Sequence, residues 1–403
     1  MARGAGYGII QAEALVKKQT LSQRNPLDCW WIILGPRQVG KTTMVKQVLE
    51  SVKTPHLFLS TDGVGSSNTV WIKQQWETAR IQLKISEAKE FLLVIDEIQK
   101  ISQWSEFVKE EWDFDTNNSI NIKVILLGSS RLLIQKGLGE SLAGRFETIY
   151  LGHWTFSEME NAFGYSADEF TYFGGYPGSA GLISNEKRWK DYIKNSLIES
   201  TISQDILMMT RVDKPALLKN LFEIGSQYSG QVLSYSKILG QLQDAGNTTT
   251  LSHYLELLSI SGLLEGLEKY YTEKVRQRSS SPKFQISNTA LLSAQVPHSF
   301  VEIKKNPEKW GRWVESAVGA HLLNFSKTED IKLYYWRHVN DEIDFVVVHK
   351  EKVIALEIKS GNTQKASGMI AFQKQFKPNK ILLIGNSGLP WQEFIKINPI
   401  ELF

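Results

Sequence analysis

Three stretches in the first third of the chain are continuously hydrophobic, with no alternating polar positions. They are Trp30–Leu34, Phe91–Ile95 and Val124–Leu127. An uninterrupted run of this length is typical of a strand that is covered on both faces in a parallel sheet. His56–Ser60 is predicted as a further strand, and apolar residues recur with helical spacing in Trp71–Ile85. The pattern therefore predicts an α/β domain over residues 1–160.

The pattern becomes mostly helical in residues 161–298, after a stretch rich in Gly, Tyr and Phe. Helices are predicted over Lys187–Ile202, Pro215–Tyr228, Ser234–Gln243 and Asn247–Ser261. Asn247 is expected to cap the last of these helices. The last two helices, followed by a predicted hairpin between residues 263 and 286, have the order typical of a winged helix. This region is predicted to be a helical connector and winged-helix domain.

Residues 299–403 combine one amphipathic helix with short strands and form the third predicted domain. The helix is expected over Trp310–Leu323, and the strands over Tyr334–Arg337, Glu342–Val348, Val353–Lys359 and Lys380–Ile384. A second helix, Ile370–Phe376, precedes the last strand. The pattern predicts a second α/β domain.

Composition limits the classes of protein that fit this chain. Its 403 residues suggest two or three domains. A formal charge of +3 is too small to indicate nucleic-acid binding by itself. The single cysteine, Cys29, excludes an internal disulfide and a cysteine-ligated zinc site. No signal peptide and no run of the ~20 apolar residues needed to cross a bilayer is evident, so we expect a cytoplasmic protein without membrane contact.

A phosphate-binding loop lies between the strand Trp30–Leu34 and the following helix. The sequence from Gly35 to Thr42 fits the pattern G-x-x-x-x-G-K-[ST] in the strand–loop–helix context that this pattern requires. Its glycines allow backbone N–H groups to surround phosphate, Lys41 is expected at the β- and γ-phosphates, and Thr42 at Mg²⁺. The predicted ATP-binding residues are Gly35, Pro36, Arg37, Gln38, Val39, Gly40, Lys41, Thr42 and Thr43.

Two adjacent carboxylates end the central hydrophobic run at residues 91–95. Asp96 is predicted to hold Mg²⁺ beside Thr42, and Glu97 to polarise the attacking water. Asp62 is the next candidate for the base.

Polar and basic residues after the strand Val124–Leu127 complete the candidate set. Ser129 and Ser130 are candidate contacts of water or γ-phosphate, although plain turn residues fit equally well. Arg131 and Arg145 could each neutralise charge in the transition state, from the same subunit or from a neighbour in a homo-oligomer.

Five stretches resemble a widespread prokaryotic family of predicted AAA+ ATPases. They are GPRQVGKTT, LLVIDEIQKI, LLGSSRLL, ESLAGRFETIYLGHWTFSEM and FGGYPGS. The resemblance runs over nearly the whole chain. It implies a doubly wound sheet with the phosphate-loop strand near its centre, and it favours Arg145 as the functional arginine. It also implies a carboxy-terminal region of unassigned function, with a winged helix and a PD-(D/E)xK nuclease-like (restriction-endonuclease-like) fold.

The predicted winged helix supports nucleic-acid binding only in part. Its second helix has no Lys or Arg on the face that is expected to be exposed, and so no residue to bind phosphate or to read guanine. The residues of that face are Thr248, Thr249, Ser252, His253 and Glu256. The predicted wing carries Lys274, Arg276, Arg278 and Lys283 and could touch DNA or RNA. The family pattern expects an Asp near Asn288, which leaves any role of that carboxylate open.

A candidate second active site lies in the last domain. Strand alternation places Glu357 and Lys359 on one face, after a strand that carries Asp344. Nucleases of the PD-(D/E)xK type use such a set: Asp344 and Glu357 are predicted to bind Mg²⁺, Lys359 to activate water, and Glu315 to add a contact from the helix.

Two functions of different classes follow. In the first, an ATP-hydrolysing motor governs a Mg²⁺-dependent nuclease that acts on nucleic acid. In the second, a nucleotide-controlled switch or scaffold uses an inactive nuclease-like domain to bind nucleic acid or a protein partner.

Overall fold

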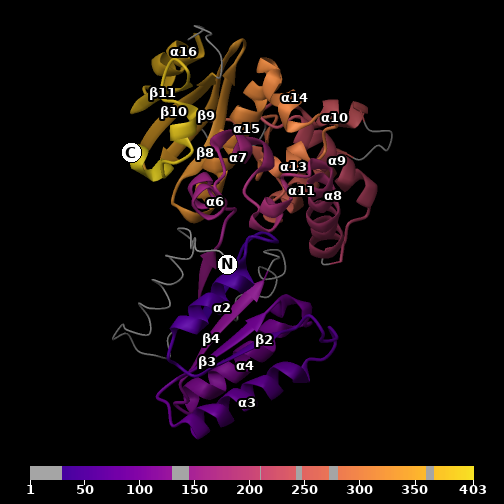
Figure 1. The fold of residues 1–403 in the computed structure, drawn as a ribbon, viewed down its shortest axis with the longest axis vertical. Coiled ribbons are helices and arrows are strands. Elements are labelled where there is room, and N and C mark those ends of the chain that lie inside the picture. The colour runs from indigo at the N-terminus through magenta and orange to yellow at the C-terminus, as the bar shows by residue number, and fades with distance from the viewer. Residues whose placement is uncertain (1–29, 129–144, 209, 242–246, 272–279, 360–366) are drawn as a thin grey trace. The chain divides into compact units, whose positions relative to one another are not determined.

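The computed structural model describes residues 30–128, 145–208, 210–241, 247–271, 280–359 and 367–403. The chain divides after Leu151 into two compact units (Figure 1). The boundary predicted near residue 298 falls inside the second unit, and the first unit ends before the predicted residue 160.

The first unit contains a five-stranded parallel sheet in the order β2-β3-β4-β1-β5. Its strands are β1 Trp30–Leu34, β2 His56–Ser60, β3 Phe91–Asp96, β4 Ile122–Gly128 and β5 Phe146–Tyr150. Its helices are α2 Lys41–Ser51, α3 Val70–Ser86 and α4 Trp104–Asn117, with the short η1 Ile98–Lys100. The predicted parallel sheet is therefore confirmed, and β1 lies between β4 and β5.

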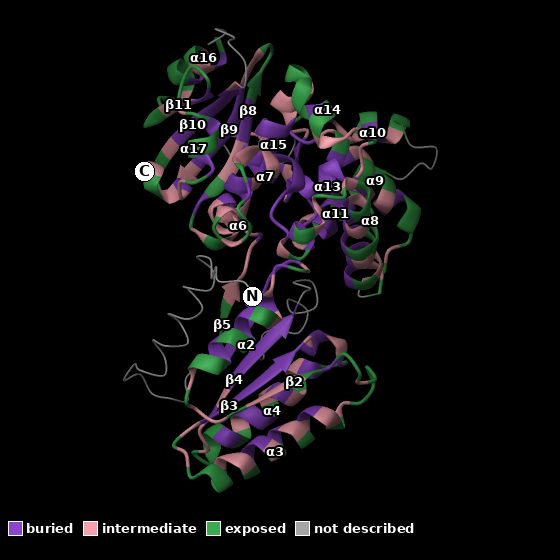
Figure 2. Cartoon of the chain, in the orientation of Figure 1, coloured by how far each residue is buried: buried purple, intermediate pink, exposed green. Residues whose placement is uncertain are grey.

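Both faces of this sheet are covered, which explains why its strands read as continuous hydrophobic runs. Trp30, Ile32 and Leu34 pack with residues of α3 and α4. Trp31 and Ile33, on the opposite face of β1, pack with residues of α2. Figure 2 shows the central strands as buried. The carboxyl ends of the strands are therefore positioned by two cores, one on each side.

The second unit begins with helices. They are α6 Phe156–Phe163, α7 Ala167–Phe173, η3 Pro177–Leu182, α8 Glu186–Tyr192, η4 Ile193–Glu199, η5 Thr201–Leu207, α9 Pro215–Gln227, α10 Tyr235–Gln241 and α11 Thr248–Ile260. The helix predicted to end at Ile202 instead continues in π-helical form through η4 and η5. Asn247 caps α11 as predicted, since its Oδ1 accepts a hydrogen bond from the Thr250 N–H at 2.7 Å.

The antiparallel strands β6 Leu264–Leu267 and β7 Lys283–Ile286 follow α11. After α13 Thr289–Ser293 and α14 Phe300–Lys305, the long helix α15 Pro307–Thr328 lies against both β7 and the last sheet. That sheet has the order β11-β10-β9-β8.

The strands of the last sheet are β8 Lys332–His338, β9 Asp341–His349, β10 Lys352–Lys359 and β11 Lys380–Gly385. The first three pair antiparallel, and β11 pairs parallel with β10 after a crossover through α16 Ser367–Phe376. The chain ends with α17 Trp391–Phe394 and η6 Pro399–Leu402. Across the described ranges, every helix is too short or too polar to span a bilayer.

Candidate functional site

The predicted phosphate loop connects β1 to α2 and requires glycine at two positions. A Cβ atom on Gly35 would lie 2.0 Å from the backbone oxygen of Leu151, so a side chain cannot be accommodated there. Gly40 has a φ of +92°, which residues with a side chain rarely adopt. Gly40 also precedes α2 without a side chain to cap it. The N–H groups of the first turn are thus oriented toward the loop, as phosphate binding requires.

The loop's lysine and threonine face different partners. Lys41 is buried, and its ammonium donates hydrogen bonds to the backbone oxygens of Gly35 at 2.9 Å and Pro36 at 2.8 Å. The hydroxyl of Thr42 donates to Asp96 Oδ2 at 2.7 Å. Asp96 is buried at the carboxyl end of β3. The fold thus brings together the two motifs that the sequence separates by 54 residues.

Glu97 adopts an unusual backbone conformation immediately after β3. Its φ is +56°, and its N–H donates to Asp96 Oδ1 at 3.0 Å. The side-chain amide of Gln99 donates to Glu97 Oε2 at 2.5 Å. The fully buried Thr61 donates its hydroxyl to the backbone oxygen of Glu97 at 2.6 Å. These contacts hold the carboxylate at the same edge of the sheet as Thr42.

The sequence analysis did not identify Thr61 or Gln99. Thr61 follows β2, the strand beside β3, so its role becomes visible only with the strand order. Asp62, the alternative base, is ion-paired with Lys100, and this contact lowers the pKa of Asp62. The ion pair makes Asp62 a weaker base than its position suggests.

The donor set at this edge fits Mg²⁺. A hydroxyl and a buried carboxylate lie 2.7 Å apart, and both are oxygen ligands of the kind that Mg²⁺ prefers. Thr42 and Asp96 would hold the ion, which would neutralise the charge of bound phosphates.

Two other predicted residues, Ser129 and Arg145, remain to be placed. Ser129, like Ser130 and Arg131, lies outside the described residues. Arg145 precedes β5, and its backbone oxygen accepts from Trp30 at the start of β1. Five steps of ~3.3 Å along β5 separate it from Tyr150, which pairs with Leu34 beside the loop, so the two ends are roughly 17 Å apart. Arg145 instead pairs with Asp113 at 3.2 Å, at the end of the strands far from the phosphate loop.

The predicted second site does assemble in space. Asp344 on β9 and Glu357 on β10 are adjacent in the antiparallel register, and Asp344 Oδ2 accepts from the Ile358 N–H at 2.8 Å. Lys359 pairs with Glu357 Oε1 at 2.6 Å. Glu315 reaches the same cluster from α15.

A residue predicted to be elsewhere, Lys283, completes this cluster. The sequence analysis placed Lys283 on an exposed wing, but it is fully buried on β7. Its ammonium lies 2.7 Å from Glu315 Oε1 and 3.4 Å from Asp344 Oδ1. The prediction that Lys283 could touch nucleic acid from the wing is therefore wrong, because two carboxylates stabilise the ammonium inside the unit. The other wing residues, Lys274, Arg276 and Arg278, lie outside the described residues.

The predicted Mg²⁺ ligands Asp344, Glu357 and Glu315 do not form a metal site in this arrangement. Within the described ranges, three or more Asp, Glu, His or Cys side chains nowhere come together as ligands for one ion. At the cluster, an ammonium takes the position between Glu315 and Asp344 that a cation would need. Burial raises the pKa of both Glu315 and Glu357 to about 7. With Lys283 in place, no position for Mg²⁺ is left between Glu315 and Asp344.

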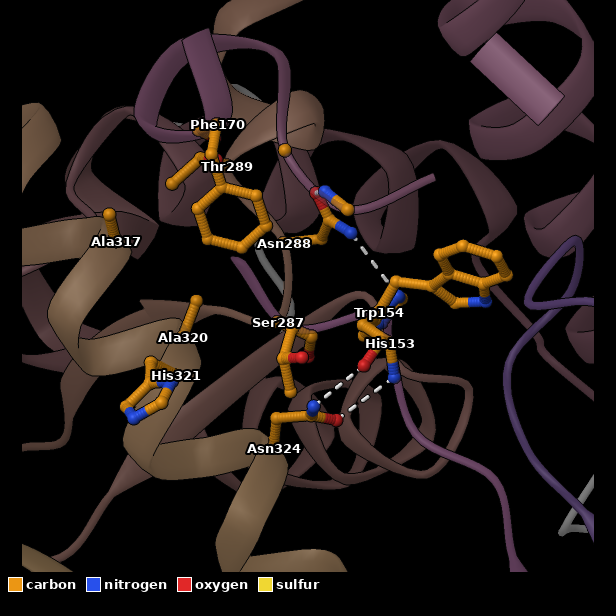
Figure 3. A pocket seen from close by; sticks show the side chains of 13 residues that line it. His153, Trp154, Phe170, Ser287, Asn288, Thr289, Ala317, Ala320, His321 and Asn324 are labelled. Carbon is orange, nitrogen blue, oxygen red and sulfur yellow. Dashed lines mark hydrogen bonds between the residues drawn. The ribbon is translucent and has the colours of Figure 1, made fainter. Parts of the chain in front are cut away.

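The region around Asn288 is closely packed. A pocket of about 20 Å³ is lined by residues that include His153, Asn288, His321 and Asn324, and it has room for roughly one water molecule. Figure 3 shows Asn324 hydrogen-bonded to the backbone of His153, and Asn288 reaching the His153 ring. Asn288 also accepts from the N–H groups of Gly175 and Ala290. The Asn288 side chain therefore links three segments of the second unit, those around His153, Gly175 and Ala290.

Comparison with known proteins follows the three regions of the chain. Residues 29–160 match a family model described as an AAA domain. This match and the parallel sheet of the first unit support an AAA-type P-loop ATPase domain in this region. Residues 165–300 and 310–403 match two further models, each described as a domain of unknown function (DUF8612 and DUF4143). No curated protein matches the chain.

Among solved structures, the chain is similar to the Aeropyrum pernix Orc1 protein in complex with DNA. The two share 10% sequence identity over 75% of this chain and 94% of that chain, with a TM-score of 0.33.

Proposed function

We propose that this chain binds and hydrolyses ATP in its first unit and acts as a nucleotide-controlled switch. The observation that carries the proposal is the 2.7 Å hydrogen bond between Thr42 and Asp96. It unites the phosphate loop with the acidic end of β3. Magnesium ion, when bound there, supplies charge neutralisation at the phosphates.

Each residue at this edge has a distinct task in the proposal. Lys41 exchanges its contacts with the loop carbonyls for contacts with the β- and γ-phosphates. Asp96 and Thr42 fix the position of the metal. Glu97 takes the proton of the attacking water, with its carboxylate oriented by Gln99.

Phosphate release from MgATP tests this proposal through Asp96→Asn. The substitution keeps the shape of the side chain but removes the charge that holds the metal, so turnover should fall by ~10²-fold or more. Glu106→Gln, an exposed substitution in α4, is the matched control and should hydrolyse ATP at the wild-type rate. Equal rates for Asp96→Asn and the control would refute the assignment.

For the second unit we favour the switch or scaffold over the nuclease. Support comes from Lys283, whose ammonium pairs with Glu315 and Asp344, two of the three carboxylates predicted to bind the metal. The order α11, β6, β7 supports a winged helix as the binding module. Thr248, Thr249, Ser252, His253 and Glu256 are all exposed on α11, and none is basic, which favours a protein partner over nucleic acid for this helix.

A Mg²⁺-dependent nuclease remains the second candidate because Asp344, Glu357 and Lys359 lie together at one end of the β9–β10 pair. The helix, three antiparallel strands, helix and parallel strand of this region are also the elements of a PD-(D/E)xK fold. The test is nicking of DNA with Mg²⁺ or Mn²⁺ by wild type and by Asp344→Ala, Glu357→Ala and Lys359→Ala. Nicking that all three variants lose would establish the nuclease, whereas absence of nicking by wild type supports the scaffold.

A further inference from the structure

Lys283 has an environment that is unusual for a lysine. It is fully buried, and no part of its side chain contacts solvent. Its ammonium contacts Glu315 Oε1 at 2.7 Å, the backbone oxygen of Asp344 at 3.1 Å and Asp344 Oδ1 at 3.4 Å. It also lies 4.7 Å from the ring centre of Phe345. An isolated ammonium would be strongly disfavoured here, so these partners are what make the burial possible.

The carboxylates depend on Lys283 in the same way. Glu315 is half-buried and lies close to the backbone as well as to the lysine, since a Cβ atom on Gly230 would lie 3.1 Å from its Oε1. The ammonium lies within ion-pair distance of both Glu315 and Asp344, and these two carboxylates favour its charged form. A protonated ammonium has no lone pair with which to bind a metal, and it repels a second cation.

The three partners belong to elements that are distant in sequence. Lys283 is on β7, Glu315 on α15 and Asp344 on β9. Further backbone contacts join the same regions: the N–H of Tyr270, after β6, donates to Tyr335 on β8 at 2.7 Å, and the Tyr335 hydroxyl donates to the backbone oxygen of Ser281 at 2.5 Å. The β6–β7 hairpin therefore contacts the last sheet in two ways. Hydrogen bonds to backbone oxygens link residues near its strand ends to β8, and the buried ion pairs of Lys283 link β7 to α15 and β9.

We propose that Lys283 is the resident cation of this acidic cluster, and that the cluster is an ion-pair joint between the β6–β7 hairpin and the last sheet instead of a divalent-metal site. The joint does not depend on the ATP site. The inference therefore stands or falls separately from the proposed ATPase.

Thermal unfolding in the absence of nucleotide, with and without Mn²⁺, tests this proposal. Lys283→Met leaves buried carboxylates without a cation and should lower the melting temperature by about 5 °C or more. Added Mn²⁺ should partly restore it, because the cluster can then accept a metal. The double variant Lys283→Met/Glu315→Leu removes one positive and one negative charge. Its melting temperature should lie closer to that of wild type than the melting temperature of Lys283→Met does. Lys332→Met, on an exposed lysine of β8, is the matched control and should leave the melting temperature unchanged.

Mn²⁺ binding to the wild-type protein, followed by electron paramagnetic resonance, gives a second measurement that does not require Lys283→Met to fold. We expect Asp344→Asn to bind as much Mn²⁺ as wild type. Any Mn²⁺ binding that is lost in Asp96→Asn belongs to the ATP site and is consistent with the proposal. Wild-type binding that is lost in Asp344→Asn would overturn it. Equal melting temperatures for wild type and Lys283→Met would do the same.

Discussion

At the scale of single residues, the ATP site depends on side chains whose partners come from other strands. Thr42 can take part in metal binding because the Asp96 carboxylate lies 2.7 Å from its hydroxyl. Glu97 is held by hydrogen bonds from Gln99 and from Thr61, which follows the neighbouring β2. The residues that carry the chemistry could be predicted from the sequence, because their spacing in the loop and their place after a hydrophobic run are distinctive. The residues that orient them could not, because an isolated Thr or Gln has no such pattern.

Glu97→Gln should separate ATP binding from hydrolysis. The amide cannot accept the proton of the attacking water, so turnover should fall by ~10²-fold or more while affinity for ATP persists. Nucleotide titration and phosphate release on the same preparation measure both quantities. Wild-type turnover in this variant would place the base elsewhere, and Asp62→Asn would then be examined.

His321 should make the second unit sensitive to acid. It is buried on α15, and in the tautomer that carries a proton on Nε2 it donates to the backbone oxygen of Ile397 at 2.9 Å. Burial lowers its pKa to about 4, from about 6.5 in the unfolded chain. The unfolded state therefore binds more protons between these two values, and stability falls as pH drops from 6.5 toward 4.

The stability loss that His321 causes is at most about 3 kcal/mol. Urea unfolding at several pH values measures it. His321→Gln keeps a donor for Ile397 but cannot titrate, so its unfolding free energy should change less over this window. A pH dependence identical to that of wild type would show that other groups are responsible.

At the scale of elements, the hydrophobic runs predicted where the strands are in the sequence but not which strands lie side by side in the sheet. β4 lies between β3 and β1, an order that determines which strand ends meet and that no local pattern encodes. Lys283 shows the same limit. In a four-residue strand, alternation cannot distinguish an exposed lysine from one whose carboxylate partners lie on α15 and β9. The sequence analysis grouped this lysine with the basic residues of the predicted wing, because its partners are distant in sequence.

The position of Arg145 at the start of β5 leads to a prediction about assembly. Since it lies at the edge opposite its own phosphate loop, any contact with γ-phosphate must be made in a neighbouring subunit. Such an arginine can contribute ~10³-fold or more. Turnover per subunit should then rise with protein concentration, and Arg145→Ala should lose hydrolysis while it keeps ATP affinity.

Two comparisons separate this role from a purely structural one. Mixing Arg145→Ala with Lys41→Ala, which keeps its arginine, should restore part of the activity. Asp113→Asn, which removes the partner of Arg145 at 3.2 Å, should leave hydrolysis intact. A concentration-independent rate without rescue, or an equal loss in Asp113→Asn, would mean that Arg145 only braces the edge of the sheet.

At the scale of the whole molecule, the chemistry divides between the two compact units. The ATP site is built from residues before the division at Leu151, and the Lys283 cluster from residues after it. Each can therefore be disabled by a substitution that leaves the other intact. A nucleotide-controlled switch requires that the first unit responds to ATP, and the second unit then supplies the surface that partners recognise.

The central claim is that ATP binds at the loop between β1 and α2, and calorimetric titration with a slowly hydrolysed ATP analogue and Mg²⁺ tests it most directly. Wild type should bind the nucleotide. Lys41→Ala should not, because the phosphates lose their side-chain cation, whereas Lys53→Ala, an exposed lysine just after α2, should bind as wild type does. No binding by wild type, or unchanged affinity in Lys41→Ala, would contradict the account.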